Sequence, residues 1–154
     1  MKIEITQNIN IDEIASFFGD SFPVYNARQY YNSRIQEELV FKALVNGEEA
    51  GYIIYTIIWG NTPYLEHVEV KDSMRGKGIA QTLVKRVLND IKTREIPYQY
   101  LLSSAEVTNN VSDEFHKKFG FKTLNTLDML HSEEQFYQID IKDIDLDNEI
   151  DKER

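Results

Sequence analysis

The chain of 154 residues contains no cysteine. This absence excludes disulfide bonds, thiolate zinc sites and a cysteine nucleophile, and it fits a reducing, cytoplasmic environment. Prolines are also few, at three, while hydrophobic residues make up 42% of the chain. Length and composition therefore predict a single globular domain that buries about two-thirds of its unfolded surface.

Long apolar segments are missing as well. The longest apolar run, YIIYTIIW at 52–59, is too short to cross a bilayer and indicates a buried strand. The N-terminal stretch MKIEITQNIN lacks the apolar segment of a secretion signal. We therefore expect a cytoplasmic protein that does not associate with membranes, either a monomer or a homodimer.

Positive charge is in deficit, because the formal net charge is −9. Such a surface disfavours nucleic acids and anionic lipid, and it favours cationic small molecules or basic peptides. Lys and Arg are nevertheless enriched at 71–94, whereas 142–154 holds six acidic and three basic residues. Two explanations stay open: the basic stretch binds an anionic cofactor, or the charges only keep the protein in solution.

Hydrophobic periodicity predicts a mixed α+β domain over residues 1–141, followed by a frayed acidic tail at 142–154. Residues 46–49 and 60–62 are hairpin-like turns, and Ser112 and Gly120 are the expected caps of the last helix. The predicted strands are 2–6, 39–46, 51–59, 63–70, 98–107, 121–126 and 136–141, and the predicted helices are 11–18, 26–38, 76–92 and 112–120.

The stretch MRGKGIA at 74–80 joins a predicted strand to a predicted helix. Two glycines and two cations at the start of a helix indicate a phosphate site. A Walker loop needs GxxxxGK[ST], which the sequence lacks, and the dinucleotide fingerprint GxGxxG fails because residue 81 is Gln. What remains is the pattern R-x-x-G-x-A, made by Arg75, Gly78 and Ala80.

Backbone N–H groups of residues 76–80 would be unpaired at the start of the helix and would point toward one place. Gly76, Gly78 and the small Ala80 allow close approach of a pyrophosphate, and Arg75 and Lys77 would neutralise its charge. The simpler interpretation, a basic turn that begins a helix, leaves the second glycine without a purpose.

Two segments carry a resemblance to a known family. The stretch VEVKDSMRGKGIAQTLVKRV resembles the cofactor motif of the GNAT superfamily of N-acetyltransferases, and NNVSDEFHKKFGF at 109–121 resembles a second motif of that family. The order of elements also matches, from residue 2 to about residue 141. The resemblance implies the family fold, a mixed, mostly antiparallel sheet of six to seven strands flanked by about four helices.

The resemblance also implies acetyl-CoA as co-substrate. Its pyrophosphate would bind residues 75–80, Ile79 included, and its pantetheine arm would pair with the backbone of Val68 and Val70. A backbone N–H near Val68 would polarise the thioester carbonyl. Asn109 occupies the position of the asparagine in the family's second motif, which contacts the cofactor.

Acetyl transfer to an amine needs a base and an acid. Glu66 and Glu69 face opposite sides of a regular strand. The resemblance favours Glu66, either as a base acting through water or as an anion that binds the substrate, while Glu69 is expected at the solvated surface. His116 stands where most family members have tyrosine. It is either the acid for the leaving thiolate, or a residue that packs or contacts pantetheine while water protonates the thiolate.

The acceptor pocket is expected between the N-terminal helices and the turn near Trp59, with Phe22, Tyr25, Tyr30 and Tyr31 as further candidates. No metal site is expected. Two functions stay open: an N-acetyltransferase that transfers acetyl directly to a primary amine of a small cationic molecule or peptide, and a non-catalytic module that binds acyl-CoA or a protein.

Overall fold

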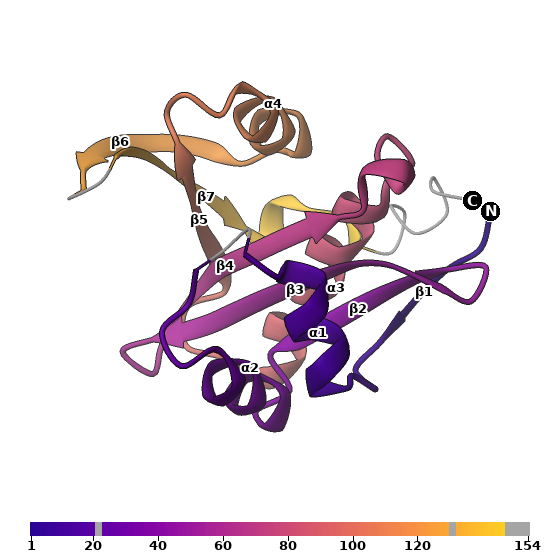
Figure 1. The fold of residues 1–154 in the computed structure, drawn as a ribbon. Coiled ribbons are helices and arrows are strands. Elements are labelled where there is room, and N and C mark those ends of the chain that lie inside the picture. Colours follow the sequence, from indigo (N-terminus) through magenta and orange to yellow (C-terminus); the bar gives the residue numbers. More distant parts are fainter. Residues whose placement is uncertain (21–22, 130–131, 147–154) are drawn as a thin grey trace.

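A computed structural model describes residues 1–20, 23–129 and 132–146. Within them the chain forms a seven-stranded sheet with helices on both faces (Figure 1). The strand order is β1-β2-β3-β4-β5-β7-β6. This architecture confirms the predicted α+β class. The elements are β1 (Ile3–Thr6), α1 (Ile11–Phe18), α2 (Ala27–Gln36), β2 (Val40–Val45), β3 (Glu48–Ile58), β4 (Thr62–Val70), α3 (Ile79–Arg94), β5 (Tyr100–Glu106), α4 (Asn110–Phe119), β6 (Lys122–Asp128) and β7 (Glu133–Asp140), with 3-10 turns at Asp72–Met74 and Ile141–Asp143.

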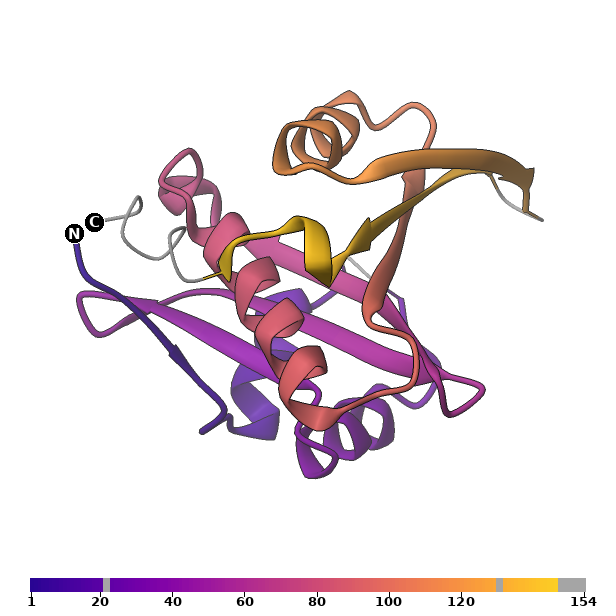
Figure 2. The same cartoon turned by 180° about the vertical axis from the view of Figure 1, so that it is seen from behind.

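Two hydrophobic clusters cover the two faces of the sheet. Side chains of strand β3 alternate between these clusters. Tyr52 and Ile54 pack in the cluster that includes α1 and α2 residues. Ile53 and Tyr55 instead pack in the larger cluster, which includes the apolar side of α3. Figure 2 shows α3 lying across this second face. The period of two in a strand thus separates an α1/α2 face from an α3 face.

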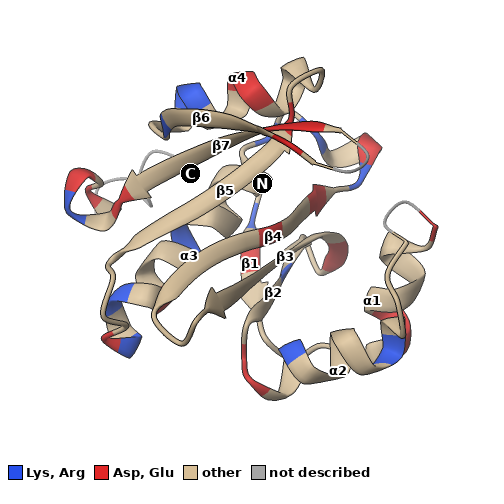
Figure 3. Ribbon diagram, turned by 90° about the vertical axis from the view of Figure 1, so that its left-hand side faces the viewer, with Lys and Arg blue, Asp and Glu red and all other residues tan. Residues whose placement is uncertain are grey.

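Strands β4 and β5 are the parallel pair of the sheet, and their register is a single pair of residues, Tyr64 with Leu102. All other neighbouring strands pair antiparallel. Beyond Tyr64 the two strands diverge (Figure 3). One edge of β4 is therefore left without a strand partner between Tyr64 and the loop that begins α3.

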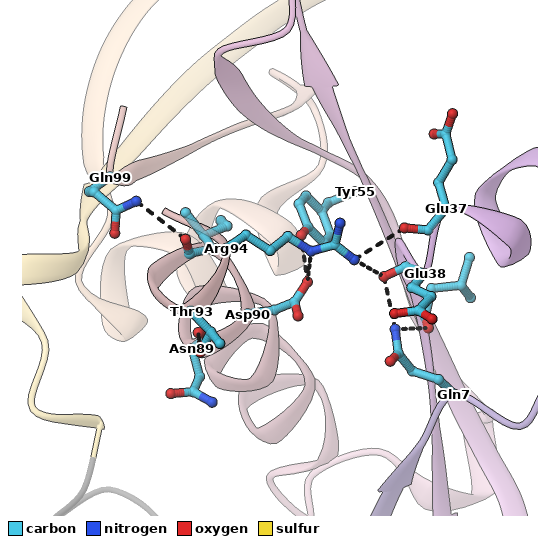
Figure 4. Close-up of polar contacts among 11 residues, drawn as sticks. Gln7, Glu37, Glu38, Tyr55, Asn89, Asp90, Thr93, Arg94 and Gln99 are labelled. Atoms are coloured by element: carbon cyan, nitrogen blue, oxygen red, sulfur yellow. Dashed lines mark hydrogen bonds and ion pairs between the residues drawn. The ribbon is translucent and has the colours of Figure 1, made fainter. Parts of the chain in front are cut away.

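Arg94 fastens the C-terminal end of α3 to the rest of the fold (Figure 4). Its Nη2 donates to the carbonyl oxygens of Glu37 at 3.1 Å and Glu38 at 2.7 Å. Its Nε donates to Asp90 Oδ2 at 2.9 Å, and the Tyr55 hydroxyl donates to the same oxygen at 2.6 Å. These contacts hold the C-terminal end of α3 against β3 and the segment between α2 and β2.

Two predicted boundaries differ from the structure. The last helix begins at Asn110, because the Asn109 side chain accepts a hydrogen bond from the Ser112 backbone N–H at 3.1 Å. Asn109 is therefore the N-cap, and Ser112 is not. At the C-terminal end, Ile144 and Leu146 pack against the larger cluster, so packed structure continues past residue 141. The expectation for residues 147–154 lies outside the described residues.

Candidate active site

The loop between β4 and α3 takes a conformation that its glycines permit. Gly76 and Gly78 have φ angles of 78° and 80°, in the left-handed region that favours glycine. A Cβ added at either position would meet no heavy atom within 4 Å. The space next to this backbone is therefore open, and the glycines serve the turn itself as well as access to it.

Backbone N–H groups of residues 76–81 form a set of unpaired donors. In the three described stretches of the chain, none of them donates a hydrogen bond. They lie at the N-terminus of the 16-residue helix α3, where the peptide dipoles produce a positive potential. Open space, free donors and positive potential together fit a phosphate-bearing group.

The charged and apolar side chains of this loop have different surroundings. Arg75 forms an ion pair with Asp72 at 3.1 Å, and its Nε donates to the Val70 carbonyl at 3.3 Å. Lys77 is exposed. Ile79 is 2% exposed and belongs to the core. Its expected role in cofactor binding can therefore come only from its backbone N–H.

The open edge of β4 presents backbone groups of Val68 and Val70. The Lys71 N–H donates to the Ala50 carbonyl, and Val70 lies opposite Gly51. Antiparallel pairing alternates, so the backbone groups of Val70 and Val68 point away from β3. They face the side on which β5 has diverged, as the sequence prediction requires. The Val70 carbonyl, however, already accepts a hydrogen bond from Arg75.

A β-bulge in β4 changes which side chains share a face. Ile54 of β3 pairs with His67, but its neighbour Tyr55 pairs with Leu65. Glu66 is therefore the extra residue, and the alternation slips by one. The prediction that Glu66 and Glu69 face opposite sides is wrong for this reason, because both lie on the α1/α2 face.

Two residues of α2 hold the Glu66 carboxylate. Its Oε1 accepts from Arg34 Nε at 2.9 Å, and its Oε2 accepts from the Tyr30 hydroxyl at 2.9 Å. The Arg34 guanidinium also lies over the Tyr30 ring, 4.5 Å from its centre. Burial and the Glu66 charge raise the pKa of Tyr30, which keeps it a hydrogen-bond donor. Glu66 is thus fixed in one orientation.

Glu69 is not the solvated residue that the sequence predicted. Its Oε2 is buried and has no hydrogen-bond partner. Burial raises the pKa of this carboxyl group, while the charge of Arg75 acts in the opposite direction. Glu69 pairs with Tyr52 of β3, which belongs to the cluster of α1 and α2, so its side chain lies on a covered face of the sheet.

Tyr64 and Ser104 join β4 to β5 at the point where the strands separate. Their hydroxyl oxygens are 2.5 Å apart. Burial raises the pKa of Tyr64, so its hydroxyl keeps its proton at neutral pH. Sequence analysis missed this pair, because the crossing of two strands 40 residues apart leaves no local pattern.

His116 is buried, with 5% of its surface exposed. Its Nδ1 lies 2.7 Å from the Ser112 carbonyl oxygen, which can only accept, so Nδ1 carries the proton. Its Nε2 then accepts from the Ser103 hydroxyl at 2.8 Å. The ring stacks on Tyr137, and burial lowers the pKa of the imidazole. Both ring nitrogens are satisfied inside the protein, which fits the packing role better than the acid role.

The expected acceptor residues are dispersed. Tyr30 reaches Glu66, but Tyr31 is 3% exposed and stacks on Phe18 in the core. Tyr25 and Trp59 are 96% and 87% exposed, so neither lines an enclosed pocket. Phe22 lies outside the described residues. Asn109 caps α4 through its side-chain oxygen, and its expected contact with the cofactor stays a prediction.

Two features are absent from the described residues. No group of three or more His, Cys, Asp or Glu side chains is placed to hold a metal ion. Among the described helices, none has both the length and the apolar character needed to cross a membrane.

Comparison with known proteins gives a family match. Residues 8–121 match the model of the acetyltransferase (GNAT) family. A search of curated protein sequences gave no match.

Similar solved structures span nearly the whole fold. A GNAT-family acetyltransferase from Bacillus cereus superposes with a TM-score of 0.76 at 18% identity, covering 91% of this chain and 98% of that one. A ribosomal-protein-alanine N-acetyltransferase from Brucella melitensis gives 0.73 at 21% identity, with 91% and 99% covered. Naa50 of Arabidopsis thaliana, in complex with the bisubstrate analogue CoA-Ac-MVNAL, gives 0.72 at 20% identity, with 90% and 99% covered.

Proposed function

This chain belongs to the acetyltransferase (GNAT) family, and from that premise we propose that it transfers acetyl from acetyl-CoA to a primary amine of a small cationic molecule or peptide. The observation that carries the proposal is the set of unpaired N–H groups at residues 76–81, next to the open edge of β4. The bisubstrate analogue bound to Naa50, which joins coenzyme A to a peptide, supports the same pair of ligands.

The loop residues would bind the pyrophosphate of coenzyme A. The free N–H groups at the start of α3 donate to phosphate oxygens, and Lys77 adds charge from the exposed side. The left-handed glycines keep side chains away from this contact. From there the open edge of β4 offers the N–H groups of Val68 and Val70 to the pantetheine arm, as an additional strand would use them.

The N–H of Val68 would polarise the thioester carbonyl. A fixed backbone donor in a site screened from water stabilises the oxyanion that forms when an amine attacks. Attack of the neutral amine on the carbonyl carbon forms the new C–N bond, and the C–S bond then breaks to release the thiolate. Both substrates are bound at once, so no acetylated enzyme forms.

Glu66 would bind the acceptor amine and accept its proton. Arg34 and Tyr30 fix its carboxylate on the α1/α2 face of β4, close to the Tyr64 hydroxyl whose pKa it raises. It takes the proton of the amine directly or through water. Because His116 is enclosed and its Nδ1 proton is bonded to a carbonyl, we assign protonation of the thiolate to water.

The test is amine-dependent thiol release from acetyl-CoA with polyamines, aminoglycosides, amino acids and peptides as acceptors. Glu66→Gln should lower kcat/KM for the best acceptor at least about tenfold and leave the KM for acetyl-CoA unchanged. Glu48→Gln, at an exposed position of the neighbouring strand β3, is the control, and it should stay within about threefold of wild type.

Two outcomes contradict the proposal. Wild-type kinetics in Glu66→Gln would show that this carboxylate does not contact the acceptor. Binding of acetyl-CoA without thiol release, for every amine tried, would identify the alternative, a non-catalytic module that binds acyl-CoA.

A further inference from the structure

Glu134, the second residue of β7, has a carboxylate oxygen that no hydrogen-bond donor reaches. Its Oε2 is buried and lacks any hydrogen-bond partner, and its Oε1 has only a long contact of 3.4 Å with the Ser132 hydroxyl. A buried acceptor without a donor costs about 1–3 kcal/mol, and more when it is charged. Such a group in a native protein calls for an explanation, and a cationic ligand that donates to it would be one.

Strand register places Glu134 on the face of the proposed acceptor site. Glu134 lies opposite Glu106 of β5, and two residues further Phe136 lies opposite Ser104. Residues directly opposite share a face, as do residues two apart on one strand. Since Ser104 bonds the Tyr64 hydroxyl, Glu134 lies on the same side as Tyr64.

Tyr64 in turn lies on the face of Glu66. It pairs with Thr56, whose neighbour Tyr55 points toward α3, so Thr56 and Tyr64 face α1 and α2. The charges of Glu134 and Glu66 both raise the pKa of the Tyr64 hydroxyl, in addition to its burial. Glu66 follows Tyr64 by two residues on β4, and Glu134 lies opposite the residue two beyond Ser104 on β5, so both lie on the diverging side of the Tyr64–Ser104 pair.

The charges nearby leave Glu134 without a neutralising partner. Glu66 is paired with Arg34. Among residues 1–20, 23–129 and 132–146, no Lys, Arg or His forms an ion pair with Glu106, Glu133 or Glu134. Figure 3 shows acidic positions on β4 and at the adjoining ends of β5 and β7. A cationic N–H donor is the complementary chemistry.

We propose that Glu134 binds a second cationic group of the acceptor, an ammonium or guanidinium distinct from the amine that is acetylated at Glu66. The acceptor is then at least a dication, such as a diamine or a polyamine, and Glu134 selects it over a monoamine. This inference rests on the proposed function, which sets the position of the acceptor site. What it adds is a second positive charge on the acceptor.

The experiment measures equilibrium binding by calorimetry to protein saturated with coenzyme A, which cannot react. The probes are α,ω-diaminoalkanes of increasing length, each compared with the 1-aminoalkane of the same length. Wild type should bind the best diamine about tenfold or more tightly than its monoamine, the range for a hydrogen bond to a charged group. Glu134→Gln should remove that preference, and Glu133→Gln, an exposed neighbour, should keep it.

Stability provides the second measurement. Because Glu134→Gln removes an unsatisfied charge without changing shape, its free energy of unfolding without ligand should equal or exceed that of wild type. A lower value would give Glu134 a structural role and overturn the proposal. Equal binding of diamines and monoamines by wild type, or equal weakening of both by Glu134→Gln, would also overturn it. Failure of thiol release alone would overturn the proposed function instead, since these binding measurements need no turnover.

Discussion

The imidazole of His116 is enclosed by Ser103, Ser112 and Tyr137, and its ionisation should limit the stability of the fold in acid. Burial lowers the pKa of His116 in the folded protein, whereas the unfolded chain has the ordinary value near 6.5. The folded state therefore binds fewer protons, and the contribution of His116 is intact above that value and declines as the pH falls below it.

We predict that the free energy of unfolding of wild type falls as the pH is lowered through about 6.5, and that His116→Gln reduces this fall. Urea denaturation at a series of pH values measures it. His67, whose pKa burial also lowers, remains in the variant and should retain part of the dependence. An unchanged pH dependence in His116→Gln would show that the buried imidazole does not govern it.

Single residues show where sequence reasoning is strong and where it fails. The loop of Gly76 and Gly78 could be predicted, because a left-handed turn before a helix leaves a local signature. The faces of Glu66 and Glu69 could not, because a bulge depends on pairing with β3 and slips the alternation. His116 was ambiguous, since only the fold shows that Ser103 and Ser112 satisfy both ring nitrogens.

At the scale of elements, Arg94 joins α3 to the connection between α2 and β2 (Figure 4). We predict that Arg94→Ala lowers the free energy of unfolding by about 1–3 kcal/mol, because Asp90 and two carbonyl groups lose a charged donor. The urea midpoint measures this loss.

Arg28→Ala is the control for Arg94. Arg28 pairs with Asp12, but the two side chains are 63% and 74% exposed, so this variant should lose less than about 1 kcal/mol. If the two substitutions have equal effects, the Arg94 contacts do not anchor α3.

The elements themselves were largely predictable. Periods of two and 3.6 residues indicated β1 to β5 and α1 to α3 close to their observed bounds. Helix α4 begins earlier than predicted, because Asn109 and Ser112 are both good N-caps and only the structure decides between them. The packing of Ile144 and Leu146 was missed, since the acidic residues around them suggested a solvated tail.

At the scale of the whole molecule, β4 and β5 pair only at Tyr64 and Leu102, and both Glu66 and the loop that begins α3 lie beyond that pair along the chain from β4. No local pattern encodes this arrangement, so it entered the sequence analysis only through the family resemblance. Family and fold are confirmed by the comparisons. The acceptor, the cytoplasmic location and the monomeric or dimeric state stay predictions.

The central claim is that the N–H groups of residues 76–81 and of Val68 and Val70 bind coenzyme A. A titration of isotopically labelled protein with coenzyme A, followed by amide nitrogen–proton correlation NMR, tests it residue by residue. These amide signals should shift together and saturate. Gly78→Ala should weaken binding at least about tenfold, whereas Gly60→Ala, with a φ of 74° and equally open space, should not. Saturable binding that shifts amides elsewhere and leaves residues 76–81 unchanged would contradict the account.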